Sequence, residues 1–516
     1  MRERLGETSP EVSLLILQLE KRDLGQERGP GEKKVEVDLE TAWGLPYSVT
    51  RRYKPLGHAG YGAYGTIRTI VAQDLNTGQP VAVKQIPDVL RSDNFAKCIL
   101  REIKLLRHLK GHENLLYLLG MEIVPMGNGR YDVSLVSGLM ESDLAKVIRT
   151  GQFLSLHHCE FFLYQILRGL KCLHTANIVH RDVTPANCLV NADCDLRICD
   201  FGLSRVVPNQ HSGRRAGGDG NAGEDVTPLT GYSAPELICG QEDYETAVDI
   251  WSVGCIALEI LIGQPLFRGR DAKDQLTQIV RFLGKPTASD MVTFRHPLVA
   301  RFLDRVKYNT PKMTPERLMS LLPKEASRDP AFADLVCRML SWNPAHRPTA
   351  AEALSHELFA ELHREEDEPE APELNEDVAE MLERLAGSPE GGSRKDQKGD
   401  SLRGDVTSML ERLTLCSAEE SSRGDKEGEE TAGTGKGREK RSASSTDGGR
   451  KKMFLDEFFK EASLVSELNK TPSYCHPEST AAQSCKGGEG QELGASCSRD
   501  ESTSGATSRE EPSVTK

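Results

Sequence analysis

The sequence predicts an α+β fold of two lobes, a small one rich in strands and a larger helical one, followed by a disordered C-terminal tail. Strand-like runs joined by a glycine-rich turn fill residues 53–86. Apolar residues then recur at helical spacing in 94–109 and in 161–174. After about Leu374 the chain is rich in Glu, Ser, Gly, Lys and Arg, and such a segment buries too little apolar surface to offset the entropy of ordering.

The overall composition excludes several functional classes. The 516 residues carry a net charge of -13, which does not suit a protein that coats nucleic acid or an anionic membrane. We find no run of the about 18 apolar residues that a membrane span needs, and we expect no signal peptide. The 13 cysteines are scattered without a CxxC pair, which indicates a reducing compartment. We therefore expect no nucleic-acid or membrane partner, and a location in the cytoplasm, the nucleus or both.

Residues 1–45 form an N-terminal extension. Ser9, Pro10 and Glu11 precede the apolar run VSLLILQLEKR, and this order predicts a capped helix. We expect this helix to dock onto another part of the protein or to be frayed, and we expect no catalytic residue in it.

A GxGxxG motif occupies residues 60–65. Dinucleotide-binding folds use the same letters, but there a helix opens directly after the glycines. Here a second strand is expected over 66–71 and a third over 81–84, which ends in Lys84. This order favours a glycine hairpin that covers nucleotide phosphates, because glycine lets the backbone approach the phosphate oxygens.

The stretch from Ile178 to Gly202 holds three polar groups at informative spacing. Asp182 lies in His-Arg-Asp, Asn187 follows five residues later, and Asp200 opens Asp-Phe-Gly. This set suits phosphoryl transfer, with one carboxylate to orient a hydroxyl nucleophile and an amide and a second carboxylate to hold Mg²⁺ on a triphosphate.

The same stretch resembles the catalytic loop and metal-binding motif of the eukaryotic protein kinases. Further stretches narrow the resemblance to the mitogen-activated protein kinases, of which the chain looks like a divergent member: YKPLGHAGYGAYG, LREIKLLRHLKGHENLL, LMESDLAKVI, LRICDFGLSR, DIWSVGCIALEILIGQPLFRGRDAKDQL and DEPEAP. The similarity runs from about residue 53 to 372. It implies the two-lobed kinase fold over 46–363, and transfer of the γ-phosphoryl group of MgATP to Ser or Thr of protein substrates in intracellular signalling.

The resemblance also implies roles for individual residues. Lys84, paired with Glu102 on the predicted helix, would position the phosphates. Asp182 would orient the hydroxyl and accept its proton, and Asn187 and Asp200 would hold Mg²⁺. The expected ATP-binding set is completed by the glycine-rich hairpin and the hinge, namely Ala59, Gly60, Tyr61, Gly62, Ala63, Tyr64, Gly65, Thr66, Ile67, Leu139 and Met140.

Two departures from the family pattern concern the active site. Thr184 stands where the family has a lysine near the transferred phosphate, and we expect it to slow or retune catalysis. Ser137 stands at the gatekeeper position, where a small side chain leaves a cavity behind the adenine unless neighbours fill it. The cavity predicts use of bulky N6-substituted ATP analogues, which competition with ATP would test.

Two other departures concern the activation segment. Asp225 and Thr227 stand at the positions of the family's phosphorylated Thr and Tyr, so we expect Asp225 or Glu224 to serve part of the basic pocket around Arg181. Loss of activity on phosphatase treatment would contradict this. The segment 230–233 is one residue shorter than in the family and lacks an arginine that shapes the site for proline after the target residue. Proline direction is therefore in doubt, and peptide-library profiling would test it, whereas the retained Thr230 favours Ser/Thr targets.

Three further contacts follow from the resemblance. Asp249 should brace the backbone of the catalytic loop, and Arg347 should pair with Glu236. The acidic residues Asp367 and Glu368, in the segment 364–516 that follows the domain, match a family site for basic docking peptides. The alternative is a solvated charged face.

The tail contains two copies of a short apolar pattern, in 377–385 and 405–413, and a third amphipathic patch in 454–468. Each could bind a groove on a partner or fold back onto the catalytic domain, or form only a transient helix. Basic clusters at 436–441 and 450–452 could act as a nuclear import signal, although such clusters are common in polar tails.

A rival from another class is a nucleotide-binding pseudokinase scaffold that acts through its docking and tail motifs. Such proteins usually lack the lysine, the catalytic Asp or the metal-binding Asp. All three are present here as Lys84, Asp182 and Asp200, which favours an active enzyme.

Overall fold

The computed structural model describes residues 45–61, 66–152, 154–207, 229–241, 245–294, 297–323, 329–372, 374, 378–379 and 445–468. Several predicted features lie outside these residues: the helix in the N-terminal extension, Glu224, Asp225 and Thr227 of the activation segment, most of the first tail repeat, the whole second repeat, and the basic cluster at 436–441. No helix in the described part of the chain is both long enough and apolar enough to cross a membrane.

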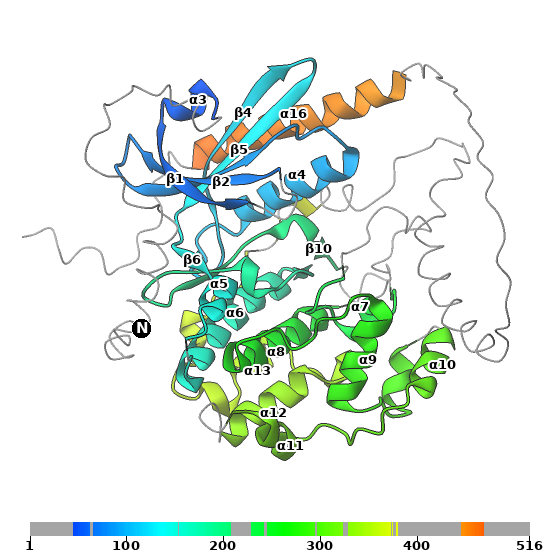
Figure 1. Ribbon diagram of the computed structural model, residues 1–516. Helices are drawn as coiled ribbons and strands as arrows, with labels where there is room; N and C mark the ends of the chain where they lie inside the picture. The colour runs from blue at the N-terminus through cyan, green and yellow to red at the C-terminus, as the bar shows by residue number, and fades with distance from the viewer. Residues whose placement is uncertain are drawn as a thin grey trace, which may run out of the picture. The chain divides into compact units, whose positions relative to one another are not determined.

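The small lobe is built on an antiparallel sheet of five strands in the order β1-β2-β3-β5-β4 (Figure 1). The strands are β1 (Tyr53–Tyr61), β2 (Arg68–Asp74), β3 (Pro80–Ile86), β4 (Leu118–Gly127) and β5 (Arg130–Gly138). Side chains of β3 alternate between buried and half-buried, as expected of a strand whose two faces differ. The strand predicted at 81–84 is confirmed within β3, and the one predicted at 66–71 is confirmed from Arg68 onward, where β2 begins.

One short helix and one longer helix flank this sheet. α3 (Tyr47–Thr50) covers one face, where Leu45, Val49 and Tyr53 pack against Ile70 and Val81. α4 (Asp93–His108) lies across the other face and confirms the helix predicted over 94–109. It begins where the Ser92 hydroxyl accepts a hydrogen bond from the Phe95 amide at 3.3 Å, which satisfies one of the free N–H groups of the first turn.

The larger lobe is helical. Its helices are α5 (Leu144–Arg149), α6 (Leu156–Thr175), α7 (Pro235–Ile238), α8 (Ala247–Ile262), α9 (Ala272–Leu283), α10 (Pro297–Arg305), α11 (Pro315–Leu321), α12 (Pro330–Met339) and α13 (Ala350–Leu354). α6 begins five residues before the predicted start at 161, because the Ser155 hydroxyl and the His158 side chain cap each other's backbone.

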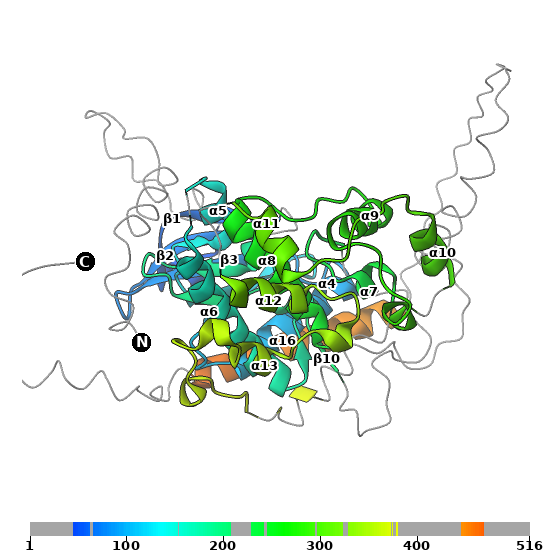
Figure 2. The same cartoon turned by 90° about the horizontal axis from the view of Figure 1, so that it is seen from below.

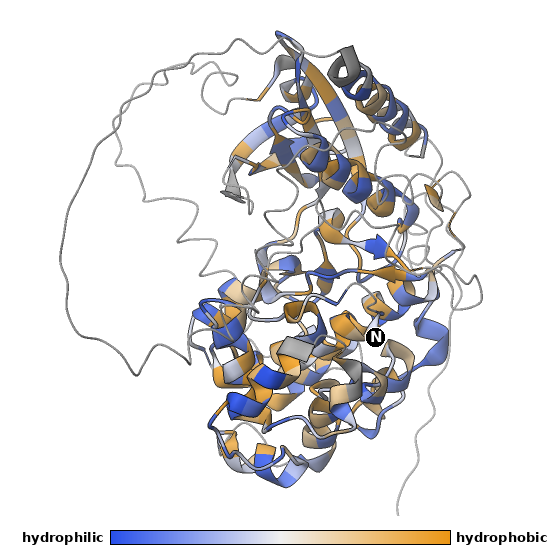
Figure 3. Cartoon of the chain, turned by 90° about the vertical axis from the view of Figure 1, so that its right-hand side faces the viewer, coloured by the Kyte–Doolittle hydropathy of each residue, from blue (hydrophilic) through white to orange (hydrophobic). Residues whose placement is uncertain are grey.

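α8 forms the centre of this lobe. It contacts both α6 and α12 (Figure 2), and its residues from Val248 to Leu261 are all buried. A helix that is apolar on every side must be enclosed by other elements. The surrounding helices instead show alternating hydrophilic and hydrophobic bands, as amphipathic helices do (Figure 3).

Two small sheets hold the catalytic stretch between the lobes. β6 (Ser142–Asp143), β8 (Cys188–Val190) and β9 (Leu196–Ile198) form one, in the order β6-β8-β9, and β7 (Ile178–Val179) pairs with β10 (Arg205–Val206) in the other. The loops around Asp182 and Asp200 are thus fixed at both ends by strands. The two-lobed α+β fold is confirmed.

Part of the tail that the structure describes is helical where the sequence predicts disorder. Residues Ser445–Leu468 form a helix, α16, which contacts α4 and β4 of the small lobe. Phe454, Phe458 and Val465 are buried. This part of the tail therefore has enough apolar surface to fold back onto the catalytic domain, one of the alternatives that the sequence left open.

A buried ion pair ties the end of the activation segment to the helical lobe. Arg347 donates from Nη1 and Nη2 to the two carboxylate oxygens of Glu236, at 2.6 and 2.8 Å, as the sequence predicts. The two side chains are 0% and 2% exposed, and the guanidinium lies 5.1 Å from the centroid of the Trp251 ring.

We expect Glu236→Gln to lower the free energy of unfolding by about 3–5 kcal/mol, because it leaves a buried guanidinium without its counter-charge. Urea denaturation measures this loss. Arg270→Ala is the matched control, since Arg270 pairs with Asp274 at the surface, and it should barely change the midpoint. Equal shifts for the two variants would contradict the prediction.

Candidate active site

Lys84 on β3 and Glu102 on α4 form an ion pair. Lys84 Nζ lies 2.5 Å from Glu102 Oε1, and the Glu102 side chain is only 5% exposed. Burial alone would lower the pKa of Lys84, but the charges of Glu102 and Asp200 outweigh it and raise this pKa above its usual value. The lysine is therefore a fixed positive charge, and the pair predicted from the sequence is confirmed.

A neighbouring contact of α4 was not predicted. Arg101, which is 2% exposed, donates from Nη1 to the backbone carbonyl of Gly202 at 2.7 Å. Two consecutive residues of α4 therefore make separate contacts: Arg101 with the Asp-Phe-Gly segment, and Glu102 with Lys84 on β3. The only sequence signal for Arg101 is its position directly before Glu102.

The carboxylates and amide of the catalytic stretch converge. Asn187 Nδ2 donates to the backbone carbonyl of Asp182 at 2.8 Å and to its Oδ2 at 2.9 Å. Burial raises the pKa of Asp182, and the charges of Asp200 and Asp249 add to this, against the opposing effects of His180 and the Asn187 amide. The carboxylates of Asp182 and Asp200 and the amide oxygen of Asn187 are oxygen ligands of the kind that a bound cation requires.

These residues fit Mg²⁺ in particular. Magnesium prefers oxygen ligands and is usually held by one or two carboxylates together with substrate phosphates and water. The described residues contain no cluster of three or more His, Cys, Asp or Glu that could hold a metal by themselves. Asp200 and the amide oxygen of Asn187 would therefore supply part of the coordination, and a phosphate chain the rest.

Asp249 at the start of α8 braces the catalytic loop. Its carboxylate accepts the backbone N–H of His180 and of Arg181, each at 2.8 Å, and the His174 ring at 3.0 Å. Burial would raise the pKa of Asp249, but these hydrogen bonds outweigh it and lower the pKa. The predicted brace is confirmed.

The loop needs such a brace because its backbone is strained. Arg181 and Asp200 both adopt left-handed conformations, with φ of 68° and 65°. Non-glycine residues avoid this region, and such strain persists only where surrounding contacts determine it. The Asp249 carboxylate provides those contacts for Arg181.

Thr184 lies within the catalytic loop, and Thr230 lies at the end of the activation segment. Thr184 is half-buried and directly precedes η2 (Pro185–Asn187), and its side chain does not cap that short helix. Thr230 accepts the Tyr232 amide at 3.2 Å and lies 3.3 Å from the Ser233 hydroxyl. At Gly231 an added Cβ would lie 2.4 Å from the carbonyl oxygen of Phe267, so this shortened segment has no room for a side chain there.

The expected nucleotide-covering residues are described only in part. β1 includes Ala59, Gly60 and Tyr61, whereas Gly62, Ala63, Tyr64 and Gly65 lie outside the described residues. Thr66 is exposed and accepts from Arg91 Nη1 at 2.9 Å, and Ile67 is buried. Ser137, Leu139 and Met140 are half-buried at the end of β5 and directly after it.

The acidic docking residues differ from each other. Asp367 is exposed, but Glu368 points inward and is only 1% exposed. It accepts hydrogen bonds from Tyr164 at 3.0 Å and His363 at 2.7 Å and pairs with Lys171 at 3.2 Å. Glu368 is thus a structural residue, and the expectation that it faces a docking peptide is wrong.

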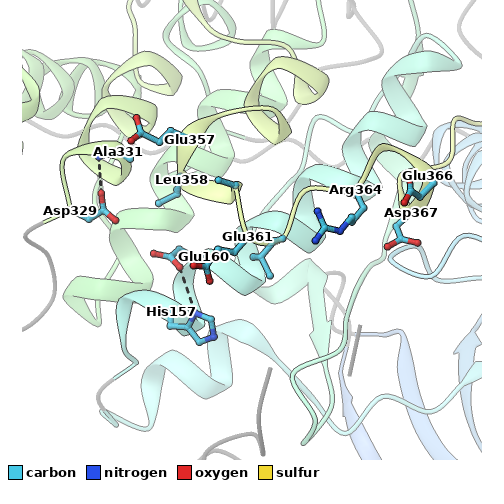
Figure 4. A pocket seen from close by; sticks show the side chains of 12 residues that line it. His157, Glu160, Asp329, Ala331, Glu357, Leu358, Glu361, Arg364, Glu366 and Asp367 are labelled. Atoms are coloured by element: carbon cyan, nitrogen blue, oxygen red, sulfur yellow. Dashed lines mark hydrogen bonds and ion pairs between the residues drawn. The ribbon is translucent and has the colours of Figure 1, made fainter. Parts of the chain in front are cut away.

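A pocket of about 650 Å³ borders Asp367, away from the catalytic loop (Figure 4). Its lining includes the guanidinium of Arg364, the ring of His157 and six carboxylates, those of Glu160, Asp329, Glu357, Glu361, Glu366 and Asp367. Burial raises the pKa of Glu160, and Asp329 and Glu361 contribute, although His157 opposes the shift. This pocket suits a positively charged ligand.

Comparison with known proteins shows which family the chain belongs to. Residues 53–359 match the protein kinase domain. The chain is 39% identical over 355 residues to mitogen-activated protein kinase 5 of Oryza sativa subsp. indica, which covers 67% of this chain and 91% of the rice protein. It is 40% identical over 328 residues to mitogen-activated protein kinase 3 of Arabidopsis thaliana, covering 63% and 83%. It is also 40% identical over 345 residues to mitogen-activated protein kinase mpkA of Aspergillus fumigatus, covering 65% and 77%.

The raised pKa of Asp182 predicts that its charged carboxylate lowers the stability of the folded protein. A carboxyl with a higher pKa in the folded state stabilises that state below its unfolded pKa, and this contribution is lost as pH rises through the folded pKa. At neutral pH the ionised Asp182 therefore destabilises the fold.

We expect Asp182→Asn, which cannot ionise, to raise Tm at neutral pH. The gain should shrink as pH falls through the raised pKa of Asp182 in the folded state, and it should be absent below about pH 3.9, the ordinary pKa of an unfolded Asp. Thermal unfolding at several pH values measures this, with the exposed Asp304→Asn as the control. A Tm of Asp182→Asn at neutral pH that is equal to or below that of the wild type would contradict the prediction.

Proposed function

This chain belongs to the protein kinase family, among the mitogen-activated protein kinases, and on that premise we propose how its own residues perform the reaction. The chain is a serine/threonine protein kinase that acts on protein substrates in signalling. The observation that supports the residue roles best is the ion pair between Lys84 and Glu102, whose lysine also feels the charge of Asp200. These are the parts that phosphoryl transfer from ATP requires.

In the proposed reaction, the hydroxyl oxygen of a substrate Ser or Thr attacks the γ-phosphorus of ATP. The bond from that phosphorus to the β-bridging oxygen breaks, and ADP leaves. Asp182 orients the hydroxyl and accepts its proton, and the Asn187 amide holds the Asp182 carboxylate in place. Lys84 binds the phosphates. Mg²⁺, held by Asn187 and Asp200, would neutralise the charge that develops on the phosphate oxygens.

The residues around the nucleotide would complete the site. We assign the cover of the phosphates to Ala59, Gly60, Tyr61, Gly62, Ala63, Tyr64, Gly65, Thr66 and Ile67, and the adenine contacts to the hinge at Leu139 and Met140. Glu102 acts by positioning Lys84. The shortened segment 230–233, which lacks the family's second arginine, supports a substrate preference that is not dominated by proline.

For partners we propose an upstream kinase and substrates or regulators with a basic docking segment. Asp367 and the adjoining acidic pocket would bind that segment, because they present several carboxylates to solvent while Glu368 does not. Activity in the cytoplasm, the nucleus or both fits such partners.

Transfer of ³²P from labelled ATP to a protein substrate tests the function. We expect the wild-type chain to label Ser and Thr but not Tyr, and Asp182→Asn to lower kcat by roughly 10²–10⁴-fold, because the positioned proton acceptor is lost. Phosphoamino-acid analysis and the unfolding data for the same variant complete the test. A wild-type enzyme that binds ATP without transfer would instead favour the scaffold.

Thr184 offers a second test. A lysine at this position would place a positive charge near the transferred phosphate, so Thr184→Lys should raise kcat, by up to about 10²-fold if no other group covers that charge. Thr184→Met, which has a long side chain but no charge, is the control and should not raise it. If both variants match the wild type, the charge is already supplied elsewhere.

A further inference from the structure

Residues 230–233 form a short turn shortly before α7. The turn is closed by its own hydrogen bonds. The Thr230 N–H donates to Ser233 Oγ at 2.9 Å, and the Tyr232 N–H donates to Thr230 Oγ1 at 3.2 Å. Because the proposed function assigns the choice of substrate to these four residues, we call them the substrate segment.

Two hydrogen bonds tie the substrate segment to α8. Tyr232 Oη donates to Glu259 Oε2 at 2.6 Å, and Ser252 Oγ donates to the Tyr232 carbonyl at 2.9 Å. The same helix carries Asp249, which braces the catalytic loop. α8 therefore holds the substrate segment and the catalytic loop together, but both of these bonds act on Tyr232, and the contacts of Gly231 come from a different element.

Gln275 on α9 contacts Gly231. α9 lies beside α7, the helix that follows the substrate segment (Figure 1). The Gln275 side chain donates from Nε2 to the Gly231 carbonyl at 3.1 Å, and its Oε1 accepts the N–H of Gly269, in the loop between α8 and α9, at 2.7 Å. Gln275 is 2% exposed, and a buried amide that lost either partner would leave a polar group unsatisfied. The pair of bonds therefore specifies one position for Gly231.

Close packing limits Gly231 from its other side. A Cβ added there would overlap the carbonyl oxygen of Phe267. That carbonyl has little freedom to move, because the Phe267 side chain is 2% exposed and packs between two aromatic rings. It stacks on Trp251 with 6.3 Å between ring centroids and meets Phe282 edge-on at 5.8 Å. Gly231 is thus held between the Phe267 carbonyl and the Gln275 amide.

We propose that Gln275 is a positioning residue for the protein substrate. By holding the Gly231 carbonyl, it fixes the path of the substrate segment and hence the place where the polypeptide around the target hydroxyl binds. The nucleotide depends instead on Lys84 and Glu102, which belong to the small lobe. Gln275 therefore acts on the binding of the protein substrate and not on that of ATP. This inference rests on the proposed kinase activity.

The test compares two glutamines of α9 in the full-length protein. Both accept a backbone N–H of the loop between α8 and α9, Gln275 that of Gly269 and Gln278 that of Arg268 at 2.9 Å, but Gln275 also donates to Gly231. Gln275→Met should raise KM for a protein substrate by roughly 2- to 10-fold, the usual worth of one hydrogen bond, and leave kcat and KM for ATP unchanged. Gln278→Met is the matched control and should change neither KM.

Three outcomes of this comparison would overturn the proposal. One is a wild-type KM for the protein substrate in a folded Gln275→Met protein. Another is an equal rise of that KM in Gln275→Met and Gln278→Met, which would assign the effect to the loop. The third is an equal rise of KM for ATP, which would indicate a general loosening of the domain.

Gly231→Ala tests the same contact from its other partner. The added methyl group would overlap the Phe267 carbonyl and displace the substrate segment from Gln275, so KM for the protein substrate should rise. Because both changes break one contact, the double variant should raise this KM by less than the product of the two single effects. Effects that multiply, or a wild-type KM in Gly231→Ala, would contradict the proposal.

Hydrogen exchange provides a measurement that does not need turnover. Backbone amides of the substrate segment should exchange faster in Gln275→Met than in the wild type, and Gln278→Met should match the wild type. If the wild-type protein transfers no phosphate, the proposed function fails, while faster exchange in Gln275→Met would still show that Gln275 holds the segment. Unchanged exchange in Gln275→Met would refute that hold whatever the activity.

Discussion

The structure depends on keeping one buried glutamate beside one lysine. Glu102 would be costly to bury alone, and its pairing with Lys84 across 2.5 Å offsets that cost only while α4 stays against the sheet. The contacts of α4 contribute to this position: the Ser92 cap, the bond from Arg101 to Gly202, and the pairing of Lys104 with α16. Loss of any of them would weaken the hold on Glu102 beside Lys84.

The catalytic loop also contains carboxylates that are costly to bury. Burial raises the pKa of Asp182, and the nearby charges of Asp200 and Asp249 add to this effect. Asp249 escapes this effect because backbone amides and His174 satisfy its oxygens. Asp249 therefore has a structural role, whereas the carboxylates of Asp182 and Asp200 remain available to a cation and a proton.

Local patterns made much of this predictable. The period of apolar residues identified β2, β3 and α4, and the family motifs identified the pairs of Lys84 with Glu102 and of Arg347 with Glu236. The inward turn of Glu368 could not be predicted, because charge in a sequence does not tell which side chain meets Tyr164, Lys171 and His363. The docking site of α16 was equally hidden, since Lys104 and Glu461 are 357 positions apart and no local period links them.

That separation has a consequence for biosynthesis. Arg107 emerges from the ribosome 354 residues before Glu461, a delay of about 20–70 s at a translation rate of roughly 5–20 residues per second. During this interval the small lobe must fold without its last helix, and the cationic end of α4 is open to other acidic chains. A chain that ends before residue 445 would lack this helix, and Lys104 and Arg107 would then have neither Glu457 nor Glu461 to pair with.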